Sequence, residues 1–168
     1  MTGQAEAAVV SAVVWKTEAR TAADTREAGR WLGTRLEPAD LVILSGELGA
    51  GKTTFTQGLG EGLGVRGPIV SPTFVIARVH PPLTGRVPLV HVDAYRLGGL
   101  AELDDLDLDA SVADSVTVVE WGEGKAEVLS GHRLDVRIER ARADDAADGD
   151  PRLITVTAYG AALLSRFA

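Results

Sequence analysis

Residues 41–53 of this chain read LVILSGELGAGKT, and they decide the fold. The first four residues are apolar and predict a buried strand. The last eight satisfy the pattern G-x-x-x-x-G-K-[ST], which is typical of phosphate-binding loops. After this loop, Phe55, Leu59 and Leu63 share one helical face, and Gly64 is the expected helix stop. The succession of strand, glycine-rich loop and helix predicts an α/β fold of the P-loop class.

The loop from Gly46 to Thr53 has the chemistry of a polyphosphate site. Its glycines allow the backbone to curl tightly and to turn several N–H groups toward one anion. The helix that begins near Lys52 adds about half a positive charge at its N-terminus, and Lys52 adds a full charge for the β- and γ-phosphates. The hydroxyl of Thr53 is suited to Mg²⁺. We therefore expect a nucleoside triphosphate with Mg²⁺ as the ligand.

Composition limits the number of domains and the kinds of partner. The chain has 168 residues, 45% of them hydrophobic, which predicts one domain over residues 1–168. The formal net charge of −7 argues against a surface that holds RNA or DNA by itself, because phosphate neutralisation needs clustered Lys and Arg. The chain contains no Cys, which excludes disulfides and thiolate metal sites. Without a signal-like start or an apolar run near the ~20 residues of a membrane helix, we expect a cytoplasmic protein.

The flanking segments predict a three-layer domain with a mostly parallel central sheet and antiparallel edge strands. Val9 to Trp15 is the expected first strand, and Thr21 to Leu36 is the expected helix, ended by Pro38. Two apolar runs that stop at a carboxylate, Val87 to Asp93 and Val116 to Glu120, predict buried strands. The remaining expected elements are an extended segment from Ser71 to Val79, a short helix from Leu100 to Leu106, and a hairpin-like edge formed by Leu134 to Ile138 and Leu153 to Val156.

Asp93 and Glu120 stand at the carboxyl ends of two predicted strands. Ligands of open α/β sheets bind beyond these ends, so both acids are expected to face the same phosphates as the glycine loop. Phosphoryl transfer needs Mg²⁺ between the β- and γ-oxygens and a group that orients the attacking oxygen, and two carboxylates can divide these tasks. Taken alone, Asp93 would be a turn residue that closes a strand; beside the loop, a role at the phosphate site is favoured.

Four segments taken in order resemble a known family: GELGAGKTTFTQGLGEGLGV, SPTFVIARVH, HVDAYRL and VVEWGEG. They are similar to the bacterial TsaE (YjeE) family, the ATPase component of the system that makes threonylcarbamoyladenosine on tRNA. The similarity runs from about Leu41 to Glu123, and the ordered combination is far more specific than the loop alone. The resemblance implies two protein partners, a TsaD-like threonylcarbamoyl transferase and its TsaB-like companion, with tRNA bound only indirectly through that complex.

The resemblance also implies roles for single residues. Lys52, Asp93 and Glu120 would be catalytic, and Thr53, Glu120 and Asp93 would be linked to the metal. Thr73 lies in a segment that resembles the family's switch-like loop, where it could sense the γ-phosphate. The expected nucleotide contacts are Glu47, Leu48, Gly49, Ala50, Gly51, Lys52, Thr53, Thr54 and Thr73.

Other nucleotide-binding functions can be compared with the sequence. The sequence argues against a GTPase, because the chain has no Asn for guanine selection and no Asp-x-x-Gly. A small-molecule kinase shares the loop but usually closes an arginine-bearing lid. Arg133, Arg137, Arg140 and Arg142 could form one, although Arg133 and Arg137 alternate with apolar residues like the exposed face of a strand. A nucleotide-controlled assembly module stays open, because no arginine finger marks the chain as self-sufficient. We expect slow hydrolysis without partners.

Overall fold

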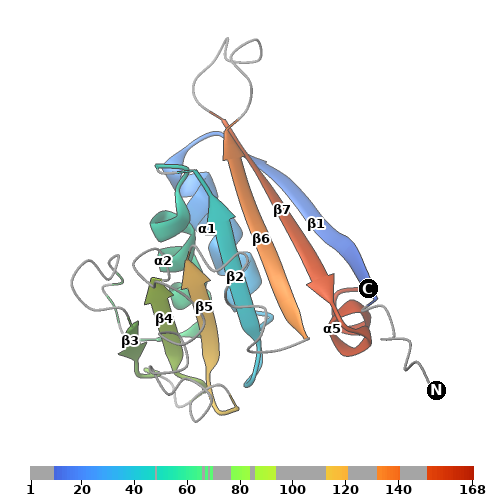
Figure 1. The fold of residues 1–168 in the computed structure, drawn as a ribbon. Helices are drawn as coiled ribbons and strands as arrows, with labels where there is room; N and C mark the ends of the chain where they lie inside the picture. Colours follow the sequence, from blue (N-terminus) through green and yellow to red (C-terminus); the bar gives the residue numbers. More distant parts are fainter. Residues whose placement is uncertain are drawn as a thin grey trace, which may run out of the picture.

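The computed structural model describes residues 10–47, 49–65, 67, 69, 77–83, 86–93, 113–120, 132–140 and 151–168. These residues form a seven-stranded sheet in the order β1-β7-β6-β2-β5-β4-β3 (Figure 1). The strands are β1 (Ser11–Ala19), β2 (Leu41–Gly46), β3 (Ala77–His80), β4 (Leu89–Asp93), β5 (Val116–Glu120), β6 (Arg133–Arg140) and β7 (Arg152–Tyr159). The helices are α1 (Ala22–Gly33), α2 (Lys52–Leu63) and α5 (Ala161–Arg166).

The centre of the sheet is parallel and its edges are antiparallel. β2 pairs in parallel with β5 on one side and with β6 on the other, and β4 pairs in parallel with β5. Outside these four strands, β7 and β1 follow antiparallel on one edge and β3 on the other. The expected mixed α/β fold with a mostly parallel centre is confirmed.

Both faces of the central strands are buried, which explains their unbroken apolar runs. On one face, alternate residues of β2 and β5 join the core cluster that contains Phe55, Leu59 and Leu63 of α2. The opposite face is no more exposed, although its residues lie outside that cluster. Its members, all at most 2% exposed, are Leu41, Ile43, Val90, Val92 and Val119.

The helices α1 and α2 pack against each other through glycines, on one face of the sheet (Figure 1). Each helix contributes two glycines spaced four residues apart, which places both on the same helical face. A Cβ on any of them would collide with a backbone carbonyl oxygen of the other helix. The separations would be 2.0 Å from Gly29 to Phe55 O, 2.2 Å from Gly33 to Leu59 O, 1.8 Å from Gly58 to Arg26 O and 2.3 Å from Gly62 to Arg30 O.

The first helix differs from its predicted bounds at both ends. Thr21 is its N-cap, and a reciprocal pair of hydrogen bonds joins Thr21 and Asp24 in a capping box. The helix ends at Gly33 rather than at Leu36, so the prediction that Pro38 ends it was wrong. The backbone N–H of Thr34 already closes the last turn on Arg30 O, before proline geometry can act.

The tail also differs from its prediction. β6 and β7 pair antiparallel, as a hairpin requires, but they do not form the edge of the sheet. β1 lies outside β7, because its backbone pairs with that strand along its length. The helix α5 was not predicted. The helix expected from Leu100 to Leu106 and residues 71–76 of the expected extended segment lie outside the described residues.

No helix in the described part of the chain combines the length and the apolar character needed to cross a membrane.

Gly58→Ala tests the contact between α1 and α2. We expect it to lower the free energy of unfolding by about 2 kcal/mol or more, since overpacking costs about 1–3 kcal/mol and the colliding atom is backbone. Urea denaturation followed by tryptophan fluorescence measures this change. Gly67→Ala is the matched control, because the nearest atom to its new Cβ would be 3.9 Å away. Equal unfolding midpoints for the two variants would contradict the close contact.

Candidate functional site

The loop between β2 and α2 depends on glycine at two positions. Gly49 has φ 77° and Gly51 has φ 108°, a region that residues with a Cβ rarely adopt. Gly51 is also the N-cap of α2, so the helix begins directly at Lys52. The loop therefore places the helix N-terminus, with its backbone N–H groups, at the carboxyl edge of the sheet.

Lys52 is folded back over this loop. Its side chain is buried, and Nζ donates hydrogen bonds to the carbonyl oxygens of Gly46 at 2.8 Å and Glu47 at 2.9 Å. Burial lowers the pKa of Lys52, while the nearby carboxylates of Glu120 and Asp93 act in the opposite direction. Three charged groups from three separate elements thus meet at one end of the sheet.

Strand register explains how the two acids reach the loop. Asp93 at the end of β4 lies opposite Glu120 at the end of β5, and Glu120 lies opposite Leu44 of β2. Leu44 is two residues before Gly46, where the loop begins. The structure therefore brings together Asp93, Glu120 and Lys52, as the placement of acids at strand ends predicts.

Glu120 is buried in a way that calls for a positively charged or hydrogen-donating ligand. It is only 2% exposed, and no hydrogen-bond donor among the described residues reaches its Oε1. Nε2 of His91 lies 3.5 Å from this oxygen. A buried carboxylate oxygen without a hydrogen-bond partner is costly, so a cation beside it would be stabilising. The residues present consequently fit Mg²⁺.

A cation at Glu120 would still need ligands from elsewhere. The described residues contain no group of three or more His, Asp or Glu side chains arranged to hold a metal ion. Mg²⁺ commonly keeps several waters and binds through one or two protein groups together with substrate phosphates. The site therefore suits a metal that arrives with a polyphosphate better than one held by the protein alone.

Two arginines that were not predicted as site residues contact the outside of the loop. Arg152 donates through Nε to Ala50 O at 3.0 Å, and an Nη2 atom of each of Arg152 and Arg140 lies 3.4 Å from Gly49 O. Arg140 of β6 lies opposite Arg152 of β7 in this antiparallel pair. Sequence reasoning considered Arg140 only for a kinase lid and missed Arg152, because their place depends on β6 lying beside β2.

A cavity of about 200 Å³ adjoins the loop. It lies where the connection from β1 to α1 passes the glycine residues. Its lining combines backbone of the loop with hydroxyl and guanidinium groups: Ala19, Arg20, Thr21, Ala22, Thr25, Gly49, Ala50, Gly51, Thr54 and Arg152. It can therefore accept a polar group attached to a phosphate in the loop.

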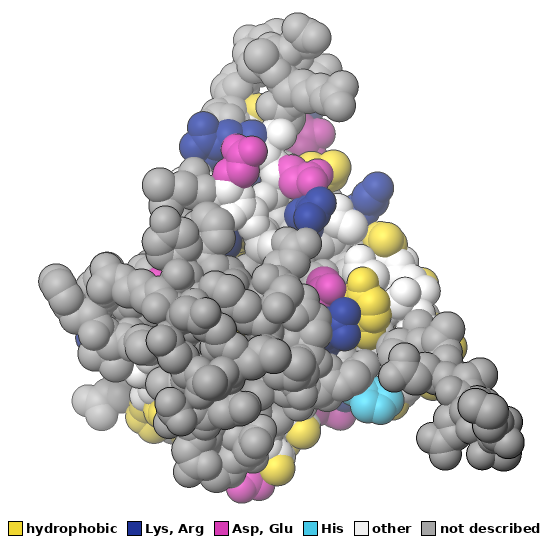
Figure 2. All heavy atoms as spheres, in the orientation of Figure 1, with side chains coloured by type: hydrophobic (Ala, Val, Ile, Leu, Met, Phe, Trp, Pro, Cys, Tyr) yellow, Lys and Arg dark blue, Asp and Glu magenta, His cyan; other side chains and the backbone are white. Residues whose placement is uncertain are grey.

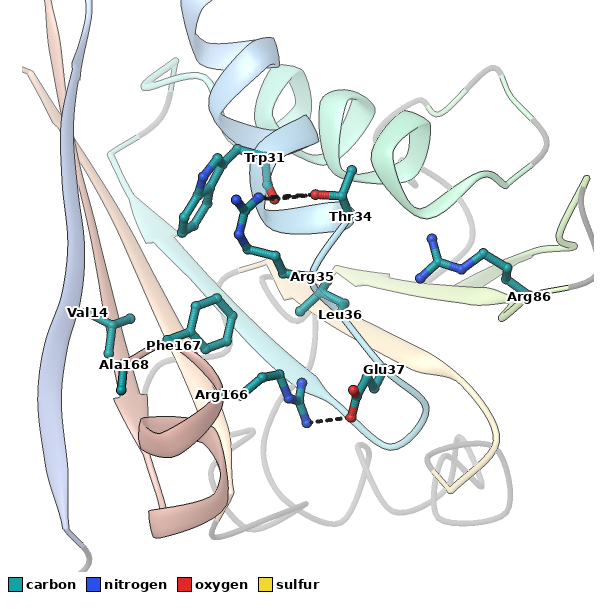
Figure 3. Close-up of a pocket in the computed structure, with 10 residues that line it drawn as sticks. All are labelled: Val14, Trp31, Thr34, Arg35, Leu36, Glu37, Arg86, Arg166, Phe167 and Ala168. Atoms are coloured by element: carbon teal, nitrogen blue, oxygen red, sulfur yellow. Dashed lines mark hydrogen bonds and ion pairs between the residues drawn. The ribbon is translucent and has the colours of Figure 1, made fainter.

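A larger cavity of about 400 Å³ lies near the amino end of β2, away from the loop (Figure 3). Its two aromatic residues, Trp31 and Phe167, and two of its arginines, Arg35 and Arg166, already have partners. Trp31 stacks on Trp15 with ring centroids 4.0 Å apart and carries the Arg35 guanidinium 4.0 Å from its ring. Arg166 forms an ion pair with Glu37 at 3.1 Å. These contacts hold α1, β1 and the C-terminal helix together.

The other predicted nucleotide contacts are placed only in part. Thr53 and Thr54 lie in the first turn of α2 and are half-buried, and Glu47 is exposed. Leu48 and Thr73 lie outside the described residues. Their roles stay predictions, as do those of the residues that the structure places.

Comparison with known proteins identifies the family. The family described as threonylcarbamoyl adenosine biosynthesis protein TsaE matches residues 19–147. The TsaE protein of Streptomyces coelicolor is 65% identical over 136 residues, covering 80% of this chain and 90% of that protein, and the Bacillus subtilis protein is 39% identical over 138 residues, covering 82% and 81%. The crystal structure of YdiB from Bacillus subtilis superposes with a TM-score of 0.70 at 32% identity, over 94% of this chain and 92% of that one. The predicted P-loop α/β fold class is thus confirmed, and the chain belongs to the TsaE family.

Proposed function

We propose that this chain hydrolyses Mg-ATP in support of threonylcarbamoyladenosine modification of tRNA, as one component of a multiprotein complex. The observation that carries the proposal is the meeting of Lys52, Asp93 and Glu120 at the loop between β2 and α2. Family membership supports the pathway, because the relatives carry the name tRNA threonylcarbamoyladenosine biosynthesis protein TsaE. ATP and Mg²⁺ are the cofactors that we propose.

The chain's own groups divide the work at this site. The N–H groups of the loop and of the first turn of α2 bind the phosphates, and Lys52 exchanges its two carbonyl partners for phosphate oxygens. Thr53 and Glu120 would hold Mg²⁺, which would supply positive charge for the phosphates. Asp93, opposite Glu120 in the sheet, orients the attacking oxygen or contacts the metal through water. Thr73 is the proposed γ-phosphate sensor.

The cavity beside the loop is where we place the nucleoside. It is continuous with Gly49, Ala50 and Gly51, so a group bonded to the phosphates reaches it directly. The hydroxyls of Thr21 and Thr54 and the side chains of Arg20 and Arg152 supply polar contacts for a ribose or a base.

Partners are expected to hold the tRNA. The chain carries a net charge of −7. On the face shown in Figure 2, the described Lys and Arg side chains are mixed with Asp and Glu and form no continuous basic patch. Ion pairs in the described part of the chain, such as Arg133 with Asp135 and Arg137 with Glu139, also place opposite charges side by side. We propose a TsaD-like transferase and a TsaB-like companion as the partners, in the cytoplasm.

Phosphate release from Mg-ATP tests the proposed activity. The purified chain alone is expected to be slow, and addition of the TsaD-like and TsaB-like proteins with tRNA is expected to accelerate release at least tenfold. Equal rates with and without partners would leave a nucleotide-controlled assembly module as the better description. ATP consumption that requires a small acceptor and yields a phosphorylated product would indicate a kinase.

Lys52→Ala and Glu120→Gln separate nucleotide binding from metal binding. Lys52→Ala is expected to weaken ATP binding about 10- to 100-fold with or without Mg²⁺, because hydrogen bonds to charged groups contribute about 1.5–3 kcal/mol. Glu120→Gln is expected to leave Mg²⁺-free binding near wild type and to remove most of the gain that Mg²⁺ provides. Calorimetric titration with ATP measures both. Unchanged Mg²⁺ dependence in Glu120→Gln would remove this residue from the metal shell.

Arg152→Ala tests whether the guanidinium group outside the loop supports nucleotide binding. Loss of its bonds to the backbone of Gly49 and Ala50 is expected to weaken ADP binding about tenfold, since each hydrogen bond contributes about 0.5–1.5 kcal/mol. Arg137→Ala, at an exposed position of β6, is the matched control and is expected to stay within about twofold of wild type. Equal ADP affinities for the two variants would argue against a role for Arg152.

A further inference from the structure

The proposed site contains a third buried polar group besides Lys52 and Glu120, His91, to which the proposed activity assigns no role. His91 is fully buried in β4, and neither of its ring nitrogens has a hydrogen-bond partner among the described residues. An imidazole buried in this way is costly unless a polar group lies within reach. The Glu120 carboxylate is a polar group near this ring: its Oε1 lies 3.5 Å from Nε2 of His91.

Strand register fixes the direction of this contact. His91 lies opposite Val118, and Asp93 lies opposite Glu120, on the parallel pair β4 and β5. Residues two apart share one face of a strand, so His91 and Asp93 project on the same side. His91 therefore approaches Glu120 from the amino-terminal side of the sheet, while the loop and Lys52 lie beyond its carboxyl-terminal edge.

The distance of 3.5 Å between His91 Nε2 and Glu120 Oε1 is slightly longer than a hydrogen bond, which normally spans about 2.7–3.2 Å between nitrogen and oxygen. A hydrogen bond between the two atoms requires one of the side chains to rotate. Among the described residues no hydrogen-bond donor reaches Oε1, and Nε2 of His91 is the donor atom 3.5 Å away from it. The positive charge of Lys52 also interacts with the Glu120 carboxylate.

We propose that His91 is a positioning residue: its Nε2 holds the Glu120 carboxylate so that the carboxylate faces the phosphate loop and the metal that enters with the nucleotide. This inference rests on the proposed function, because it assigns Glu120 to the metal. Removal of a residue that hydrogen-bonds to a metal ligand typically lowers metal affinity about 10- to 100-fold. The competing role is packing alone, in which an apolar side chain of similar size would serve equally well.

Metal affinity distinguishes the two roles. The probe is Mn²⁺ binding to the full chain with saturating ADP, followed by electron paramagnetic resonance, and supported by ADP affinity without metal and by urea denaturation. His91→Leu is expected to weaken Mn²⁺ binding about tenfold while it leaves metal-free ADP affinity within about twofold. His91→Gln, which keeps an N–H donor, is expected to restore Mn²⁺ affinity to within about threefold of wild type. His80→Gln is the matched control, since His80 is also a buried histidine but lies at the end of β3.

The outcomes separate this inference from the proposed function. The positioning role would be overturned if His91→Leu bound Mn²⁺ as tightly as wild type, or if His91→Leu and His91→Gln lost Mn²⁺ affinity equally. In either case the proposed function would still stand if Glu120→Gln lost Mn²⁺ affinity. Wild-type Mn²⁺ affinity in Glu120→Gln would overturn both claims. If His91→Leu fails to fold, the comparison of His91→Gln with His91→Asn decides instead. Loss in the shorter Asn variant alone supports positioning, and equal affinities of the two overturn it.

Discussion

The close contact between α1 and α2 is the constraint on which the rest of the structure depends. Four glycines let the two backbones approach within a distance that any Cβ would block. Each of these glycines weakens its own helix by about 1 kcal/mol relative to Ala, so packing has to outweigh that cost. In return, the close packing fixes the positions of two parts of the proposed site. α2 begins at Lys52 and α1 begins beside the cavity next to the loop, so one contact sets where both of these parts of the site lie.

The sheet provides the other half of the site. Parallel pairing of β4, β5 and β2 brings their carboxyl ends to the same edge, where Asp93 and Glu120 face the start of the loop. The cost is concentrated here, because Lys52, Glu120 and His91 are polar groups buried at the end of an apolar core. Such local conflict with the rules of core formation is common at functional sites. In this chain it is partly relieved by bonds from Lys52 to the loop backbone.

Local sequence patterns predicted the strand, loop and helix around Gly51, and the stop of α2 at Gly64, because each depends on neighbours within a few residues. They also predicted that two strands would end at Asp93 and Glu120. The place of the tail was not predictable in the same way. β6 lies beside β2 and carries Arg140 past the loop, and this pairing joins residues about ninety positions apart. Arg152 and α5 were missed for the same reason, since contacts distant in sequence decide them.

A crystal structure of the chain with Mg²⁺ and a non-hydrolysable ATP analogue is the most direct test of the account. We expect the phosphates to lie in the loop, with Lys52 Nζ moved from the carbonyl oxygens of Gly46 and Glu47 to the phosphate oxygens. The metal should lie between those phosphates and the Glu120 carboxylate. A nucleotide bound elsewhere, or bound with Lys52 still on the loop carbonyls and no metal near Glu120, would contradict the proposed site.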